Sequence, residues 1–216
     1  LNALDTFDSA IKADEKNGQA YAWKACALGQ GLFRGYIEED FNVVWKQAED
    51  NLKKARELNE NDFEVHRLMS EVTLAMKDFR AAQRHSKLAY DMVPNDPRVL
   101  SVYGDVCVRT GKVDEGVDAL KLALDLDPIP QGKTNADPRH AGLLFAYYMS
   151  RDKDGCLEQI GHLDEIDVRS WLITTKICSD EEHDYENLDW FKEGKKLFAD
   201  KDWGKVVPDF RLNNDS

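Results

Sequence analysis

The chain has 216 residues, of which 42% are hydrophobic, so it is long enough to bury a continuous core. Its 41 acidic and 29 basic residues give a net charge of −12, which repels phosphate backbones and anionic lipid surfaces. Because the sequence has neither a segregated basic patch nor an apolar run of about 18 residues, we expect no nucleic-acid or membrane partner.

The first segment, 1–17, has the periodicity of a helix. Leu1 enters the pattern without a capping residue, and Ala3, Phe7 and Ala10 share one helical face. We interpret the segment as the second helix of a partial repeat whose first helix is missing. The sequence therefore predicts that the chain is part of a longer protein.

The next segment, 18–62, is predicted to form two helices. From Gly18 to the start of the following segment at Phe63 is 45 residues, 11 more than the spacing found further along. Glycines interrupt the helical pattern within 29–40. We therefore expect an insertion in a loop at 29–40.

The segments 63–96 and 97–130 can be laid over each other. They start at Phe63 and Pro97, which gives a period of 34 residues (97 − 63 = 34). Small residues recur in step in the two segments, and a proline closes each one. These matching positions are Ser70 and Gly104, Ala82 and Gly116, and Pro94 and Pro128.

This pattern resembles the tetratricopeptide repeat (TPR) family. The family motif W-x2-L-G-x2-Y, A-x3-F, A, P is matched at its small and terminal positions and is degenerate at its aromatic ones. The resemblance implies an all-α fold, an α-solenoid of TPR-type helical hairpins wound into a right-handed superhelix. Small residues let the two helices of each hairpin approach closely, and the next hairpin covers the exposed face.

The pattern continues, with changes, toward the C-terminus. A further hairpin is predicted at 137–167, with Leu144 at the small position and about six inserted residues before it. We therefore expect the repeat array to cover 1–167. Divergent capping helices and a tail should follow at 168–216, with Trp203 packing back.

No catalytic, metal or cofactor site is predicted. Gly132-Lys133-Thr134 ends like a P-loop but lacks the preceding glycine and strand, and the glycines near Gly29 miss the dinucleotide-binding spacing. The acidic run 179–184 lacks the ligand spacing of an EF-hand. The five histidines form no H-x-x-x-H face, so we expect ordinary core or surface histidines and no enzyme.

The four cysteines lie far apart and form no C-x-x-C pair. We interpret them as buried thiols in a reducing compartment, which favours a cytoplasmic protein. They are Cys26, Cys107, Cys156 and Cys178.

The resemblance places a partner-binding groove along the first helix of each hairpin. Arginines there suit a carboxylate and aromatic residues suit an apolar anchor, so we expect a scaffold or adaptor that binds a peptide or helix of a partner protein. The expected partner-binding residues are Arg67, Glu71, Arg98, Asp105, Arg109, Phe145, Tyr148 and Met149.

The family's clamp for chaperone C-termini is absent, because its lysine and asparagine positions are occupied by Ala22, Cys26, Arg67 and Glu71. Binding of a chaperone tail is therefore not expected.

Two alternatives stay open. The chain could instead form a homodimer, by end-to-end stacking or by exchange of the helix at 3–13. It could also be the regulatory region of a larger signalling protein, since the C-terminal helices weakly resemble those attached to bacterial cyclases.

Overall fold

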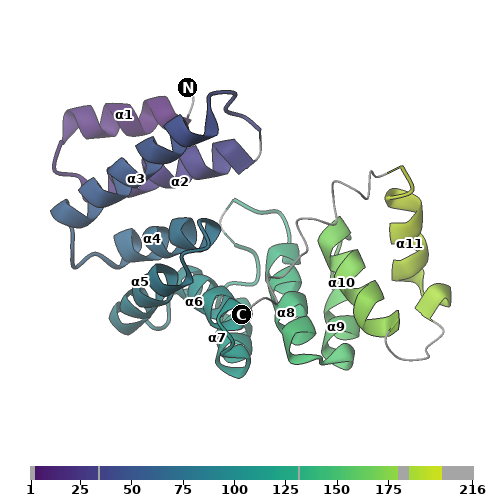
Figure 1. The fold of residues 1–216 in the computed structure, drawn as a ribbon. Helices are drawn as coiled ribbons and strands as arrows, with labels where there is room; N and C mark the ends of the chain where they lie inside the picture. The colour runs from purple at the N-terminus through teal and green to yellow at the C-terminus, as the bar shows by residue number, and fades with distance from the viewer. Residues whose placement is uncertain (1–2, 34, 131, 180–184, 201–216) are drawn as a thin grey trace. The chain divides into compact units, whose positions relative to one another are not determined.

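The computed structural model describes residues 3–33, 35–130, 132–179 and 185–200, and no strand occurs among them (Figure 1). The chain divides into two compact units, 1–112 and 113–216. The first unit contains α1 (Ala3–Ala13), α2 (Gly18–Phe33), α3 (Phe41–Leu58), α4 (Phe63–Ala75), α5 (Phe79–Met92) and α6 (Pro97–Arg109). The second contains α7 (Val113–Leu126), α8 (Asp137–Ser150), α9 (Lys153–Ile160), α10 (Val168–Ser179), the short 3-10 helix η1 (Tyr185–Asn187) and α11 (Asp189–Leu197).

The unit boundary lies between Lys112 and Val113, inside the predicted segment 97–130. The sequence-based division at 167/168 stays a prediction. No helix in the described part of the chain is long and apolar enough to cross a bilayer.

Aspartate side chains begin many of the helices. Asp62 accepts hydrogen bonds from the backbone N–H groups of Glu64 and Val65. Such a cap satisfies donors that a helix leaves unpaired in its first turn, and its negative charge is favourable at that end. The same role is filled by Asp40, Asp78, Asp96, Asp152 and Asp167. Part of the acidic excess is therefore structural.

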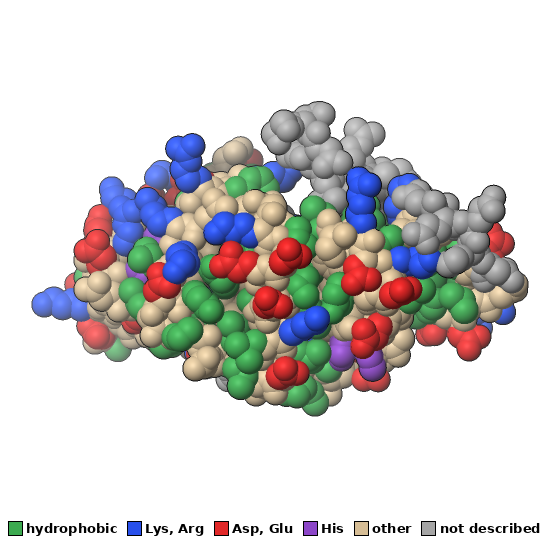
Figure 2. Space-filling view, turned by 90° about the horizontal axis from the view of Figure 1, so that it is seen from below, with side chains coloured by type: hydrophobic (Ala, Val, Ile, Leu, Met, Phe, Trp, Pro, Cys, Tyr) green, Lys and Arg blue, Asp and Glu red, His purple; other side chains and the backbone are tan. Residues whose placement is uncertain are grey.

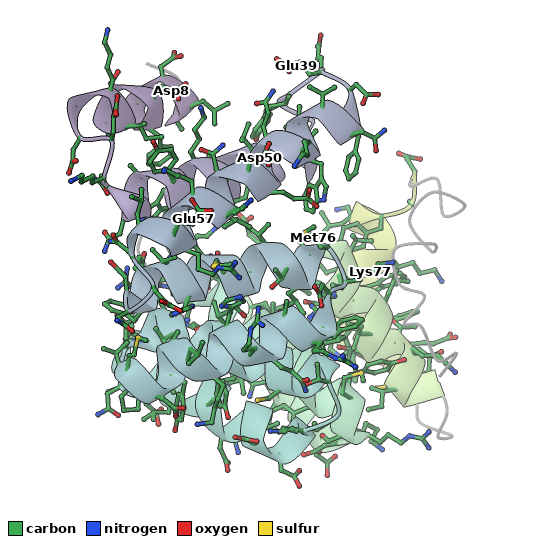
Figure 3. All side chains as sticks on the ribbon, turned by 60° about the vertical axis from the view of Figure 1, so that its left-hand side comes forward. Asp8, Glu39, Asp50, Glu57, Met76 and Lys77 are labelled. Atoms are coloured by element: carbon green, nitrogen blue, oxygen red, sulfur yellow. The ribbon has the colours of Figure 1, made fainter. Side chains whose placement is uncertain are left out.

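Three turns between helices share one geometry. In each, a residue with left-handed φ is followed by a residue whose N–H donates to the carbonyl five residues earlier. The left-handed residues are Lys77 (φ 61°), Gly111 (φ 88°) and Arg151 (φ 60°). Lys77, visible at the α4–α5 turn in Figure 3, and Gly111 are one 34-residue period apart. The turn thus recurs in step with the sequence pattern.

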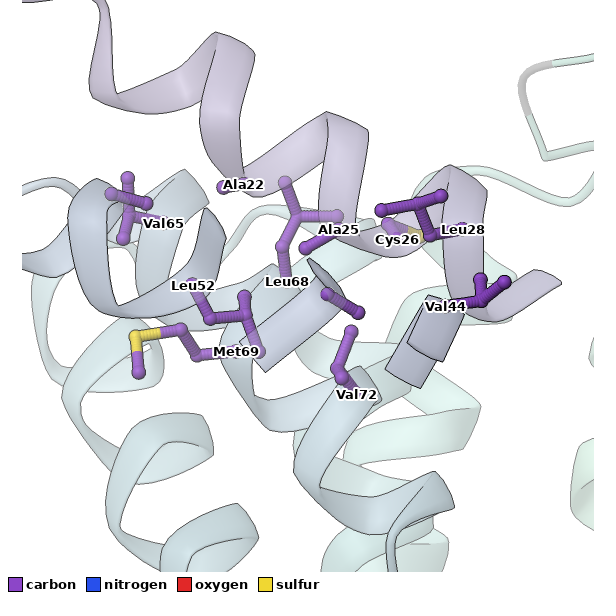
Figure 4. Packing of buried hydrophobic residues seen from close by; sticks show 12 residues of the cluster. Ala22, Ala25, Cys26, Leu28, Val44, Leu52, Val65, Leu68, Met69 and Val72 are labelled. Carbon is purple, nitrogen blue, oxygen red and sulfur yellow. The ribbon is translucent and has the colours of Figure 1, made fainter. Parts of the chain in front are cut away.

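Small side chains form much of the core of the first unit, as Figure 4 shows. Ala22 and Ala25 of α2 pack with residues of α3 and α4, including the fully buried Leu68. In the next hairpin, Ser70 Oγ donates to the carbonyl of Ala82 at 3.1 Å. A larger side chain at these positions would hold the helices apart.

The predicted loop at 29–40 is shorter than expected. Helix α2 continues through Gly29 and Gly31 to Phe33, so the prediction that glycines end the helix there was wrong. The reason is a tertiary contact: Ile37 lies against Gly31, where an added Cβ would approach Ile37 Cδ1 to 2.6 Å. Gly31 leaves room for the following loop to fold back onto α2.

Glycine contacts also define the hairpins of the second unit. A Cβ on Gly155 of α9 would lie 2.6 Å from the ring of Tyr147 in α8. A Cβ on Gly194 of α11 would lie 2.1 Å from Trp171 Cδ1 in α10, whose indole N–H donates to the carbonyl of Phe191 at 3.2 Å. The expected helices after residue 168 are therefore present as α10 and α11. The expected contact of Trp203 and most of the acidic run 179–184 lie outside the described residues.

Candidate interaction site

The first helices of successive hairpins lie next to one another in the first unit. Helix α4 contacts α2 and α6. Side chains at equivalent repeat positions therefore meet: Glu64 faces Arg98, 34 residues on, and Cys26 faces Glu71, 45 residues on. A row of polar contacts therefore joins the three helices, from Cys26 and Glu71 through Arg67 and Glu64 to Arg98.

Arg67 of α4 lies at the centre of this row. Its Nε and Nη2 donate to the two carboxylate oxygens of Glu64 at 3.0 and 2.8 Å, and its Nη1 donates to Glu71 at 2.6 Å. Trp23 of α2 lies over the guanidinium, with Arg67 Cζ 5.3 Å from the ring. Arg67 is only 5% exposed, so this fork binds acids of its own helix.

Arg98 of α6 extends the network to the surface. Its Nη2 donates to Asp96 at 2.8 Å, and its Nη1 lies 3.4 Å from Glu64. The Arg98 side chain is 39% exposed, in contrast to the buried Arg67. Glu64 therefore joins a buried arginine to a partly open one.

The charges of this network shift the pKa values of its members. Burial opposes the charge of Arg67, but hydrogen bonds to Glu64 and the nearby charges of Glu71 and Glu64 outweigh it and raise the pKa of Arg67. Burial raises the pKa of Glu71, with the Arg67 charge acting against it. Burial first, and then the Glu71 charge, raise the pKa of Cys26 to about 12. The Cys26 thiol therefore stays protonated and is a poor nucleophile.

Asp105 and Arg109 form a separate ion pair one turn apart on α6. Arg109 Nε donates to Asp105 at 2.8 Å, and both side chains are partly exposed. An exposed pair of this kind contributes at most about 1 kcal/mol. These two predicted site residues keep contact with solvent.

The remaining predicted residues belong to α8 in the second unit. Phe145 is buried, and the guanidinium of Arg169 lies 4.4 Å from the centre of its ring. Tyr148 and Met149 are half-buried. Phe145 therefore packs inside its own unit and is covered on one side by Arg169.

Sequence reasoning did not include Trp23 and Glu64 in the site. A signal for Glu64 exists, because it and Arg98 have opposite charges at the same position of successive repeats. A signal for Trp23 is weaker, since only its place on a predicted first helix distinguishes it. The positions of Trp23 and Arg67 in the sequence did not indicate that the Trp23 ring covers the Arg67 guanidinium.

No group of three or more potential metal ligands occurs among the described residues. All four cysteines are buried thiols, as the sequence predicted. On the face shown in Figure 2, acidic and basic side chains are interspersed. The site on α2, α4 and α6 consists of ion pairs and an aromatic ring, and such groups suit recognition of another polypeptide.

Solved structures with a similar fold exist, whereas comparison with family models and with curated proteins finds no match. No protein family model matches the sequence, and no curated protein matches it. Solved structures do match. PilF of Pseudomonas aeruginosa superposes with a TM-score of 0.64 at 14% identity, over 94% of this chain and 86% of that one.

Two further structures are described as TPR proteins. TTC0263 of Thermus thermophilus superposes with a TM-score of 0.56 at 19% identity, over 82% of this chain and 87% of that one. YrrB, described as having an unusual peptide-binding site, superposes with a TM-score of 0.50 at 15% identity, over 90% of this chain and 82% of that one. At these identities the similarity concerns the fold alone.

Proposed function

Starting from a TPR-like fold, an all-α solenoid of helical repeats, we propose that the chain is a non-catalytic scaffold that binds a peptide or helix of a partner protein. The binding face is formed by α2, α4 and α6 of the first unit. The observation that carries the proposal is the network joining Trp23, Arg67, Glu64 and Arg98 across these three helices. The peptide-binding site described for YrrB supports this class of partner.

Two members of the network are buried and fixed, and two are exposed to solvent. Arg67 and Glu64 are both buried and hold each other in a two-point ion pair. Trp23 is 37% exposed and the Arg98 side chain is 39% exposed, so they are the members of the network that reach solvent, although Nε and Nη2 of Arg98 both donate to Asp96. A tryptophan ring offers a large apolar contact with few rotatable bonds, and a carboxylate of the partner would compete with Asp96 for the exposed Arg98 guanidinium. The favoured ligand is an extended or helical segment with an apolar side chain close to an acidic one.

A reducing, cytoplasmic setting is part of the proposal. It is supported by four buried cysteines that are not joined in disulfides. Thiols in such sites behave as small apolar groups.

The test is selection of binding peptides against the purified chain. A phage-displayed peptide library is selected on the wild-type protein alone, and the affinity of the selected peptides is then measured on the wild type and on a Trp23→Ala/Arg98→Glu variant. The selected peptides should bind the wild type and lose at least tenfold in affinity on the variant. The control is Lys87→Glu, which reverses an exposed charge on α5, outside the proposed face, and should change affinity less than threefold.

Two results would contradict the proposal. One is a set of peptides that bind the wild type and the double variant equally, which would place recognition elsewhere. The other is no enrichment of any sequence while the protein is folded by circular dichroism.

A further inference from the structure

A second candidate surface lies in the first unit, at the end of α2 that meets the α2–α3 loop. A cleft of about 460 Å³ opens between α1, α2, this loop and the start of α3. Its lining residues are Leu4, Leu28, Tyr36, Ile37, Glu38, Glu39, Val44 and Gln47. The residues of the network described above do not line it.

The floor of the cleft is apolar and fixed. Leu28 and Val44 belong to the buried core, and Leu4 and Ile37 pack against that core as partly buried residues. Ile37 is held in place by its contact with Gly31. An apolar side chain entering the cleft would meet a preformed surface, which lowers the entropic cost of binding.

The loop holds its own residues in a defined arrangement. The backbone N–H groups of Tyr36 and Ile37 both donate to the carbonyl of Gly31, at 2.8 and 3.3 Å. Gly35 supplies the left-handed turn, with φ of 68°. Tyr36 is 77% exposed beside the cleft. The loop therefore presents an aromatic ring that a partner could cover.

The rim of the cleft is acidic. Glu38 and Glu39 are exposed, and neither forms an ion pair with a described residue. Their neighbour Asp40 is engaged in capping α3, where it accepts from Asn42 and Val43. Two open carboxylates beside an apolar floor are complementary to a ligand that carries positive charge next to an apolar side chain.

These residues belong to the part of the chain that departs from the repeat. The spacing from Gly18 to Phe63 exceeds the 34-residue period, and the hairpin at 63–96 has no equivalent of the loop at 35–40. Loops that interrupt a regular scaffold often carry binding residues. The extra residues here build one wall of the cleft.

We propose that this cleft binds a short basic segment of a partner protein, in which one bulky apolar side chain is flanked by lysine or arginine. The apolar side chain contacts the partly exposed Leu4 and Ile37, above the buried Leu28 and Val44, and the flanking cations pair with Glu38 and Glu39. Tyr36 covers the bound side chain from the loop. This site is independent of the α2–α4–α6 face.

The test uses three synthetic hexapeptides as probes: Lys-Lys-Leu-Phe-Lys-Lys, the same sequence with serines in place of Leu-Phe, and Glu-Glu-Leu-Phe-Glu-Glu. NMR titration follows the methyl signals of Leu4, Leu28, Ile37 and Val44. The first peptide should shift these signals in a saturable way at low ionic strength. The serine peptide and the acidic peptide should bind at least tenfold more weakly.

Two variants test the residues. Glu38→Lys/Glu39→Lys should weaken binding of the first peptide at least tenfold, and Tyr36→Ser at least threefold, with unchanged thermal unfolding. Glu57→Lys/Glu60→Lys makes the same change of charge at the other end of α3, where Figure 3 places Glu57 away from Glu39. This control should alter affinity less than twofold.

Three outcomes would overturn the proposal. Equal binding of the serine peptide would mean that charge alone is recognised, and equal loss in the Glu57→Lys/Glu60→Lys control would mean that the site is not local. Self-association of the wild type in sedimentation velocity, abolished by Glu38→Lys/Glu39→Lys, would mean that a second copy of the chain covers the cleft.

Discussion

His66 and His85 face each other with their Nδ1 atoms 2.9 Å apart, in stacked rings buried between α4 and α5. Nε2 of His66 lies 2.8 Å from the carbonyl of Glu60, so it must carry the proton and donate. Nδ1 of His66 then accepts from His85, whose Nε2 in turn accepts from Arg84 at 3.2 Å. Both rings are therefore neutral: Arg84 donates to His85, His85 donates to His66, and His66 donates to the carbonyl of Glu60.

This arrangement makes the first unit sensitive to acid. Burial first, then the neighbouring His66 ring and the positive charges of Arg84 and Arg56, lower the pKa of His85 from 6.5 to about 4, against the opposing charge of Asp78. Between pH 6.5 and about 4 the unfolded chain takes up a proton at His85 and the folded chain does not. The free energy of unfolding is therefore unaffected by His85 above pH 6.5, and it decreases as the pH falls from 6.5 toward 4. Urea unfolding at pH 7.5 and pH 5.0 should show this loss.

His85→Gln is the matched variant, because the amide N–H of glutamine can donate to His66 Nδ1 as His85 does, and a His–Gln pair at the same spacing occurs elsewhere in the chain with the glutamine oxygen accepting. His140 Nδ1 lies 2.9 Å from Gln159 Oε1, and the two residues are 19 positions apart, as are His66 and His85. The variant should keep a hydrogen bond to His66 and show a smaller loss of stability between pH 7.5 and pH 5.0. An unchanged loss would assign the acid sensitivity to other groups.

Replacing Arg67 by Gln should destabilise the protein by about 3 kcal/mol, because it leaves the buried carboxylate of Glu64 without its two-point partner. Arg109→Gln removes a partly exposed pair and should cost less than about 1 kcal/mol. Urea unfolding measures both. Equal losses of stability in the two variants would show that burial of the Arg67–Glu64 ion pair does not make it more important to the fold than an exposed pair. Binding experiments should for this reason alter Trp23 or Arg98 in place of Arg67.

Gly155→Ala and Gly194→Ala should each cost about 1–3 kcal/mol, because the new methyl group would overlap the rings of Tyr147 and Trp171. Gly142→Ala is the control. It lies within α8, and its added Cβ would be 3.8 Å from the nearest side-chain atom, so it should be neutral or stabilise by about 0.5–1 kcal/mol. Thermal unfolding monitored at 222 nm separates these cases. A neutral Gly194→Ala would contradict the packing of α10 on α11.

The turn residues Lys77 and Gly111 should respond in opposite directions. Lys77→Gly removes a side chain from a left-handed conformation and should stabilise by up to about 1 kcal/mol, while Gly111→Ala should destabilise by about 1–2 kcal/mol. The two changes occupy equivalent positions of successive repeats. Chemical denaturation of both variants checks the shared turn, and a destabilised Lys77→Gly would show that Lys77 has contacts that outweigh its strain.

The hairpins were predictable because their requirements are local. Small residues at Ser70 and Ala82 and a turn at Gly111 recur at a fixed spacing, and each has a steric reason that can be read from the sequence. The length of α2 was not predictable. Glycines weaken a helix, and the packing of Ile37 against Gly31, which requires a glycine at that position, involves a residue of the following loop.

The site was predictable only in part. First-helix positions predicted Arg67, Glu71 and Arg98 as site residues, and ion pairs join them: Arg67 binds Glu71 and Glu64, and Glu64 also contacts Arg98. Their role in binding a partner stays a prediction. Which arginine is buried depends on how neighbouring side chains pack. For the same reason the covering of Phe145 by Arg169, from a different helix, gave no signal in the sequence.

The most direct test of the proposed function is hydrogen–deuterium exchange of the protein with and without a peptide selected on it. Slower exchange in α2, α4 and α6, centred on the segments that contain Trp23 and Arg98, is the predicted result. Protection confined to α3 and α5, or no change at saturating peptide, would contradict binding at the first-helix face.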